Sequence, residues 1–148
     1  PIIQALGCGI GDEMDLLIMK TNDAEGTVEL TGRELLGTWE ENAAAFAPGQ
    51  TVTGIVRSVE DYGVFVELAP NLAGLAEPFE GACPGDACSV YIKSLLPERM
   101  KIKLVMIDLC GKADVTPCRY FIDTDAVRHM DHWRYSPEEC RRIVETEF

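Results

Sequence analysis

The 148-residue sequence has few positive charges and no long apolar run. Its 13 lysines and arginines face 25 aspartates and glutamates, so the formal net charge is −12. No apolar stretch approaches the roughly 20 residues of a membrane-spanning helix, and no signal peptide opens the chain. We therefore expect a cytoplasmic protein without a membrane partner.

Sequence motifs of catalysis are also missing. The chain contains no Gly-rich phosphate loop, no nucleophile elbow and no paired metal-ligand motif. Three carboxylates, Asp61, Glu67 and Glu77, are candidates for an acid/base pair, but acidic residues are common here and we interpret them as solvated. We expect neither an enzyme nor a small-molecule substrate.

The six cysteines and two histidines do not follow a metal-binding pattern. Cys83 and Cys88 are separated by four residues around a Pro-Gly turn, at the edge of the usual spacing for structural zinc, which normally uses two tight pairs. The other candidate ligands are scattered: Cys110, Cys118, His129 and His132. We interpret the cysteines as reduced thiols and expect no metal and no cofactor.

Charge is unevenly distributed along the chain. Residues 1–47 carry nine acidic and two basic side chains. Four of the five basic residues within 48–110 fall in one eleven-residue stretch, opposed there only by Glu98: Lys93, Arg99, Lys101 and Lys103. A local basic surface is therefore compatible with an acidic protein.

The N-terminal third predicts a hairpin followed by a helix. The stretch "GDEMDLLIMKTNDAEGTVELT" forms two strands around an Asn22–Gly26 turn, in which Gly26 supplies a positive φ. Thr31 and Glu34 have the spacing of a capping box, which starts a helix with one apolar face that ends at 47–49.

The middle of the chain predicts two further hairpins. Strands at 51–59 and 64–68 meet at Asp61-Tyr62-Gly63, and strands at 88–96 and 101–108 meet at 97–100, with an irregular stretch between the two hairpins. Alternation points Val64, Val66 and Leu68 inward and Phe65 and Glu67 outward. Four short strands within about 60 residues favour a small barrel or sandwich.

The tail is predicted to contain a helix. Ser136 is the expected N-cap, Pro137 the first helical residue and Glu139 the partner in a capping box. We expect this extension to pack on the barrel through Phe121, Trp133 and Ile143. The alternatives are a protein-docking element or an extension of a binding surface on the barrel.

Two segments of the chain resemble each other. "GDEMDLLIMKTNDAEGTVEL" and "GDACSVYIKSLLPERMKIKL" both run from Gly-Asp through a strand, a turn and a second strand that ends in Leu. Both are interpreted as the closing hairpin of one kind of module, the first of which lacks its front half in this sequence.

Residues 49–107 contain an ordered set of motifs: Gly49-x-x-Val52-x-Gly54-x-Val56, Val59-x-x-Tyr62-Gly63-x-Phe65-Val66-x-Leu68, Gly74-Leu75, Pro84-Gly85-Asp86 and the Lys101–Leu104 strand. In this order and spacing they resemble the S1 RNA-binding domain, a five-stranded OB-fold barrel named after ribosomal protein S1. The resemblance implies a mainly β fold in three parts. Residues 1–47 are the closing hairpin and linker helix of a truncated preceding module, 48–110 a complete barrel and 111–148 an extension with a terminal helix.

The resemblance also implies a function, namely single-stranded RNA binding in translation, with mRNA and the small ribosomal subunit as expected partners. The implied binding residues are Tyr62, Phe65, Lys101, Lys93, Lys103, Arg99 and Arg57. Two positions depart from the family: Glu77 replaces a frequent His, and Leu96 stands near a frequent acidic residue. These departures leave open a protein-interaction module that has lost RNA affinity.

Overall fold

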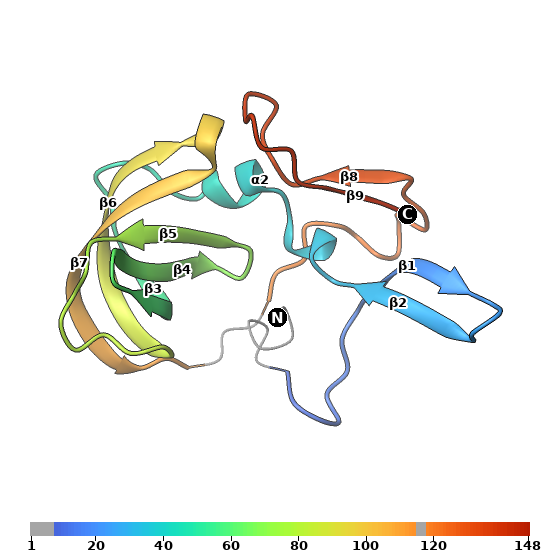
Figure 1. The fold of residues 1–148 in the computed structure, drawn as a ribbon, viewed down its shortest axis with the longest axis horizontal. Helices are drawn as coiled ribbons and strands as arrows, with labels where there is room; N and C mark the ends of the chain where they lie inside the picture. Colours follow the sequence, from blue (N-terminus) through green and yellow to red (C-terminus); the bar gives the residue numbers. More distant parts are fainter. Residues whose placement is uncertain (1–7, 115–117) are drawn as a thin grey trace.

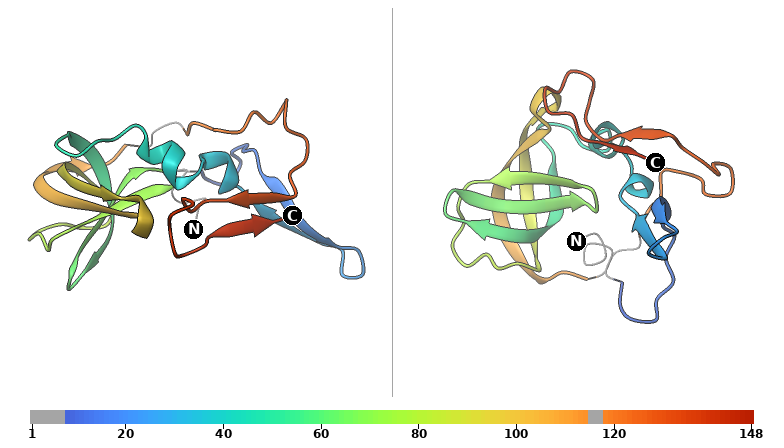
Figure 2. Two further views of the ribbon diagram at one scale, coloured as in Figure 1. Left: turned by 90° about the horizontal axis from the view of Figure 1, so that it is seen from above. Right: turned by 45° about the vertical axis from the view of Figure 1, so that its right-hand side comes forward.

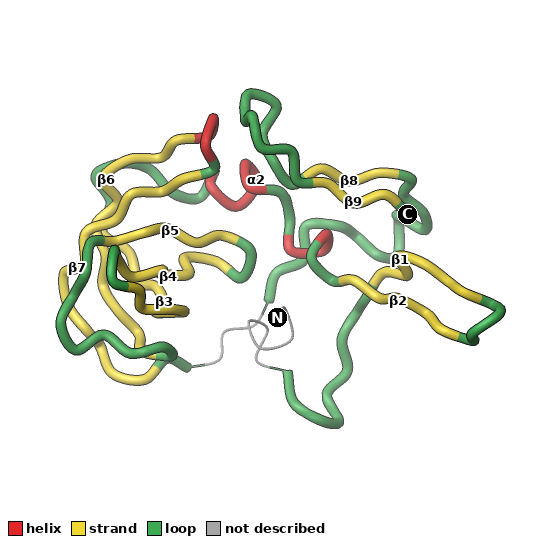
Figure 3. Tube along the Cα trace, in the orientation of Figure 1, coloured by secondary structure: helices red, strands yellow, loops and turns green. Residues whose placement is uncertain are grey.

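The computed structural model describes residues 8–114 and 118–148. A five-stranded barrel lies at one end of the molecule, and two small hairpins lie at the other, with a short helical linker between them (Figure 1, Figure 2). Strands predominate, and the helical turns are confined to the linker and to the tip of one barrel hairpin (Figure 3). Within the described residues, no helix combines the length and apolar character needed to cross a bilayer.

The barrel closes in the order β3-β4-β5-β7-β6. All neighbouring strands are antiparallel except β5 and β7, which are parallel. This is the five-stranded arrangement of an OB-fold, and the mainly β prediction is confirmed. The strands are β3 Thr51–Glu60, β4 Gly63–Ala69, β5 Leu72–Ala76, β6 Asp86–Leu96 and β7 Lys101–Lys112.

Alternation along the strands fills the barrel interior. Each strand contributes side chains that are almost fully buried, and Trp39 of the linker covers the same core. Among the most buried side chains of the barrel are Val56, Val64, Val66, Leu72, Ala76, Cys88, Val90, Ile92, Ile102 and Leu104. Phe65, between the buried Val64 and Val66, and Glu67, which follows Val66, point outward, as the alternation predicts.

Strand β5 lies in the stretch that the sequence analysis treats as irregular. It pairs with β4 on one side and with β7 on the other, and so closes the barrel. Gly74 makes the parallel contact possible, because a Cβ there would lie 2.6 Å from Leu104 Cδ1 and 3.0 Å from the Ile102 carbonyl oxygen. The run is only five residues long and contains this glycine, which weakens a strand pattern in sequence.

The N-terminal hairpin forms as predicted. Strands β1 (Leu17–Asn22) and β2 (Thr27–Thr31) pair antiparallel around Gly26, whose φ is 66°. Ile18 pairs with Leu30 and Thr21 with Val28, so the apolar side chains share one face. That face is exposed: Ile18 retains 61% of its accessible surface.

The predicted continuous helix of the linker is wrong in detail. A 3-10 turn η1 (Glu34–Leu36) and a helix α2 (Trp39–Ala43) are separated by Gly37, whose φ of 84° interrupts a helix. Thr31 Oγ1 donates to Glu34 Oε2 (2.7 Å) instead of capping a helix. A capping box does form, but farther along the chain, between Thr38 and Glu41 at the start of α2.

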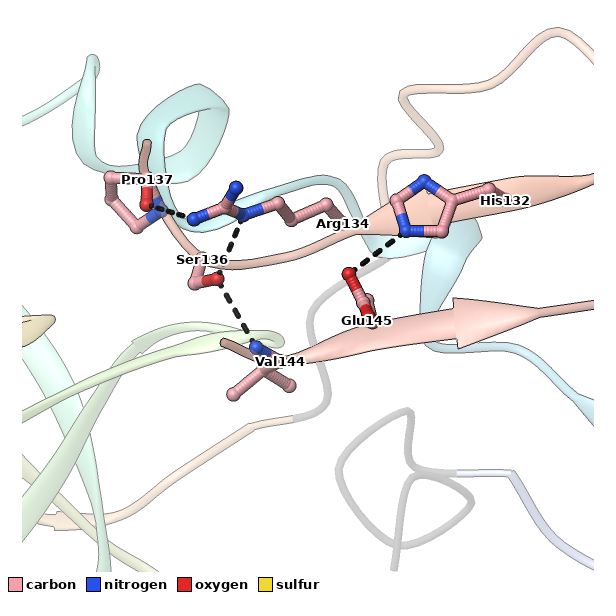
Figure 4. Close-up of polar contacts among 6 residues, drawn as sticks. All are labelled: His132, Arg134, Ser136, Pro137, Val144 and Glu145. Atoms are coloured by element: carbon pink, nitrogen blue, oxygen red, sulfur yellow. Dashed lines mark hydrogen bonds and ion pairs between the residues drawn. The ribbon is translucent and has the colours of Figure 1, made fainter. Parts of the chain in front are cut away.

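The predicted C-terminal helix is also wrong. The tail forms a second hairpin, β8 (His132–Arg134) with β9 (Glu145–Glu147). Figure 4 shows why: Ser136 Oγ accepts from the Val144 amide (3.1 Å), eight residues away, instead of capping a helix. Long-range pairing has overridden a local helix pattern, and no strand forms at 118–122.

The tail packs mainly on the linker. Tyr135 joins three parts of the molecule, because its carbonyl accepts from Trp39 N (3.0 Å) and its hydroxyl donates to the Asn71 carbonyl (2.6 Å) between β4 and β5. Burial raises the pKa of Tyr135, so this hydroxyl stays protonated as a donor. Of the three predicted contact residues, Trp133 is buried and Phe121 lies against Gly37, whereas Ile143 is exposed.

Candidate nucleic-acid interface

Two aromatic rings lie together on the outer surface of the barrel. Tyr62 follows β3 in the tight turn to β4, and Phe65 is the third residue of β4. Their ring centroids are 6.1 Å apart with an interplanar angle of 87°, an edge-to-face pair. Tyr62 retains 65% of its accessible surface, so one ring stands largely in solvent while Phe65 supports it.

The glycine between these aromatics sets their position. A Cβ on Gly63 would lie 2.3 Å from the Ala76 carbonyl oxygen and 2.9 Å from Leu75 Cδ1. Glycine therefore lets the start of β4 approach the end of β5 closely. That approach brings Tyr62 and Phe65 beside the outer face of β5.

A row of outward side chains leads from the aromatic pair to the basic strand. Phe65 is paired with Leu75 on β5, and Leu75 is paired with Lys103 on β7. Lys103 is in turn paired with Ser94 on β6. Leu75 is an exposed member that the sequence analysis did not propose, because its strand was not recognised. The signal in the sequence that could have identified Leu75 is its place after Gly74 in the S1 family pattern.

The predicted lysines stand out from the barrel wall. Lys101 and Lys103 are exposed and alternate with the buried Ile102 and Leu104, as expected. Arg99 is exposed in η2 (Pro97–Arg99), the turn between β6 and β7, and Lys93 is exposed on β6. Within 8–114 and 118–148, no ion pair involves any of these four cations.

Arg57 differs from the other predicted cations. Its Nε donates to Glu67 Oε2 across β3 and β4, so its charge is balanced on the barrel surface. The remaining acids near the aromatic pair are Glu60, Asp61 and Glu77, all of them exposed. The aromatic side of the surface is therefore locally acidic, and the unpaired cations lie on β6, η2 and β7.

The elements of this surface are those that OB-folds use for ligands. In such barrels, the second and third strands and the loops after the first and fourth strands bind oligonucleotides and oligosaccharides. Here these elements are β4 and β5, the turn that holds Tyr62, and the turn that holds Arg99. Six of the seven predicted residues thus lie along one continuous surface, and Arg57 borders it as part of an ion pair.

The cysteines contribute no metal centre to the described part of the chain. No group of three or more His, Cys, Asp or Glu side chains among those residues is arranged to hold a metal ion. Cys88 lies inside the barrel, where burial and then the nearby Cys110 raise the pKa of its thiol. Its Sγ donates to the Gly54 carbonyl (3.5 Å).

Comparison with known proteins agrees with this architecture. No family model matches the chain. Small ribosomal subunit protein bS1 of Leuconostoc lactis is 30% identical over 108 residues, which cover 65% of this chain and 25% of that protein. The barrel is S1-like. Other bS1 proteins match the chain at 24–34% identity.

Two further proteins that are similar to this chain are not named as bS1. A 4-hydroxy-3-methylbut-2-enyl diphosphate reductase of Fusobacterium nucleatum is 30% identical over 103 residues, 68% of this chain and 12% of that enzyme. Among solved structures, GSP13 from Bacillus subtilis is 29% identical, covering 41% of this chain and 55% of its own, with a TM-score of 0.38. The chain spans a quarter or less of the length of these curated relatives.

Proposed function

We propose that the chain binds single-stranded RNA on the outer surface of its S1-like barrel. Tyr62 and Phe65 stack on bases, and Lys101, Lys103 and Arg99 meet phosphates. Lys93 adds a further cation to this surface. Arg57 contributes to phosphate binding only when its ion pair with Glu67 is broken. One observation carries the proposal: outward side chains on neighbouring strands lead from Tyr62 and Phe65 through Leu75 to Lys103. Lys103 forms no ion pair with the described residues.

The chemistry of these side chains suits single strands. Every base has a π-face, and stacking on an aromatic residue contributes about 1–3 kcal/mol per base without reading sequence. Unpaired lysines bind phosphate and release counterions, so affinity depends on salt. The surface is thus suited to sequence-tolerant binding.

The proposed biological role is non-catalytic and lies in translation. The relatives named bS1 are proteins of the small ribosomal subunit. By analogy, this chain would help mRNA engage that subunit in the cytoplasm. The similarity to a segment of a reductase covers 12% of that enzyme, so it supports a shared module more than a shared reaction.

One observation favours a second candidate function. Glu60 and Asp61 directly precede the exposed Tyr62, and Glu77 follows the end of β5; these three exposed carboxylates repel phosphate. A barrel with this acidic surround would serve as a protein-interaction module that does not hold RNA.

Binding of labelled single-stranded RNA, measured by fluorescence anisotropy at low and at physiological salt, separates these functions. The Tyr62→Ala/Phe65→Ala double variant should lose roughly 30-fold or more in affinity, since each lost stacking contact is worth about 1–3 kcal/mol. Tyr120→Ala, in the tail, is the aromatic control and should bind like the parent.

Circular dichroism verifies that the double variant is folded. If the folded double variant binds as well as the parent, the assignment of Tyr62 and Phe65 is wrong. If the parent itself does not bind RNA at low salt, the protein-interaction function is supported instead.

We also propose that the segment before residue 48 is the closing hairpin and linker of a preceding S1-like module. The exposed apolar face of β1–β2 supports this, because a two-stranded hairpin needs further strands or a packing partner to be stable. The parent gene should then encode strand-forming segments immediately upstream. An upstream sequence without them would contradict this domain organisation.

A further inference from the structure

A second patch of exposed aromatic and aliphatic side chains lies on the wall formed by β6 and β7. Tyr91 retains 40% of its accessible surface and is paired with Val105, which is also exposed. Ile107 follows two residues later on β7, and Thr51 of β3 lies on the other side of Tyr91. Tyr91 is thus an exposed ring on the outer wall of the closed barrel, on a different strand from Phe65.

This wall is the most basic part of the barrel. Residues 86–112, which span β6, η2 and β7, carry five basic side chains and three acidic ones, within a chain of net charge −12. Its lysines lie between the two aromatic patches. Lys103 is paired through Leu75 with Phe65 on one side, and it is two residues from Val105, the partner of Tyr91, on the other.

We propose that Tyr91 is a second base-stacking platform and that bound RNA crosses from β4–β5, over the lysines of β7, to β6. This inference rests on the proposed RNA-binding function and extends its site to a further strand. In this path the phosphates contact Lys101 and Lys103 on β7. Bases stack on Tyr62 and Phe65 on one side of these lysines and on Tyr91 on the other side.

Strand geometry makes the path continuous. Neighbouring strands are about 4.8 Å apart, so Phe65 and Lys103, two strand positions apart, are separated by about 10 Å of surface. Val105 lies about 7 Å farther along β7, at two strand residues, and Tyr91 is on the adjacent strand. One oligonucleotide can therefore contact both patches without leaving the barrel.

Charge favours RNA over a protein as the occupant. An apolar patch alone fits many partners, but Lys93, Lys101 and Lys103 border this one on its own strands and have no ion-pair partner among the described residues. An aromatic ring beside unpaired cations is the combination that single-strand binding proteins use.

The length of the bound oligonucleotide tests this path. OB-folds occupy about 4 to 16 nucleotides, so a short oligouridine of about 4 nucleotides should fill only the Tyr62 side, and one of about 10 should reach Tyr91. Tyr91→Ala should weaken the longer RNA roughly tenfold and leave the shorter one unchanged. Tyr91→Phe should retain binding, and Tyr120→Ala is the control.

The two proposals fail in different ways. If the parent binds neither RNA, the proposed function fails, and this inference with it. If both RNAs bind and respond to the Tyr62→Ala/Phe65→Ala variant, but Tyr91→Ala changes neither or weakens both equally, only the extended path is overturned.

Photocrosslinking to the unmodified protein provides a measurement that does not depend on the folding of a variant. A 4-thiouridine oligonucleotide of about 10 nucleotides should crosslink to the peptide containing Tyr91, and one of about 4 should not. Binding of the longer RNA without any crosslink to β6 would overturn the inference and assign the patch to another partner.

Discussion

Hairpins β1–β2 and β6–β7 have similar sequences but different surroundings. A Gly-Asp pair precedes β1 by several residues and another stands at the start of β6, and each hairpin pairs two antiparallel strands with one apolar face. In β6–β7 that face lies in the barrel core, where Ile92 has 0% exposure. In β1–β2 it faces outward, and Leu30 retains 54%. The same local pattern therefore accompanies very different packing.

The difference separates what forms a hairpin from what stabilises it. Alternation and a turn residue suffice to pair two strands, but free energy comes largely from burial of the apolar face. The β6–β7 face is covered by β3, β4 and β5. The β1–β2 hairpin is connected to the rest of the molecule at its end, where Thr31 donates to Glu34 and Glu34 also accepts from Thr146 of β9.

The outer faces of the two hairpins differ as well. Lys20 on β1 is paired with Glu29 on β2, so opposite charges face each other. On β7, Lys101 and Lys103 have no such partner among the described residues. Among the described residues, neither Lys20 nor these two lysines forms an ion pair, but only Lys20 has a carboxylate as its cross-strand neighbour.

The largest effect on stability is expected from truncating a leucine to alanine at corresponding positions of the two hairpins. Leu104→Ala in β7 should lower the free energy of unfolding of the barrel by about 2–5 kcal/mol, because it leaves a cavity in a packed core. Leu30→Ala in β2 should change it by less than about 0.5 kcal/mol, as exposed positions do. Native-state amide exchange of β3–β7 measures the free energy of unfolding of the barrel in both variants. Equal losses would show that the face of β1–β2 is covered in solution.

An intermediate effect is expected at the anchor of the first hairpin. Thr146→Val removes the hydroxyl that donates to Glu34 Oε1 (2.7 Å), and leaves a buried carboxyl oxygen unsatisfied at a cost of about 1–3 kcal/mol. Amide exchange should accelerate in β1–β2 and β9 but not in β6–β7. Thr21→Val, on exposed β1, is the matched control. Uniform acceleration through the barrel would contradict an anchor local to the hairpin.

The smallest expected effect concerns the outer faces. Lys103→Gln should reduce the slope of log K against log salt for single-stranded RNA by about 0.7, the value for one lost phosphate contact. Lys20→Gln on β1 should leave the slope unchanged. Titrations at four salt concentrations determine both slopes. An equal change in the two variants would mean that the lysines act through net charge alone.

Much of the barrel was predictable because the sequence features that specify most of its strands are local. Alternation identified β3, β4, β6 and β7, and the turn residues placed both hairpins. The outward direction of Phe65 followed from Val64 and Val66. The family pattern was needed to group Tyr62 with the lysines, since they are some forty residues apart in sequence.

The errors share one physical origin. Strand β5 has little pattern of its own and exists because β4 and β7 offer it hydrogen bonds on both sides. The tail has a good local helix pattern but forms β8–β9, since Ser136 bonds to Val144 and Cys140 is buried. The linker helix is interrupted at Gly37, where Phe121 from the tail packs.

The sequence by itself determined the two strands of the N-terminal hairpin and four of the five barrel strands, each with an apolar and a polar face, because side-chain alternation is a local property of the chain. It also determined that the cations are concentrated before and within β7. Only the tertiary structure decided which apolar faces are covered, how the tail folds, and that Arg57 forms an ion pair whereas Lys103 forms none with the described residues. Those outcomes depend on which distant segments meet, and packing and long-range hydrogen bonds, unlike alternation, are absent from any single stretch of sequence.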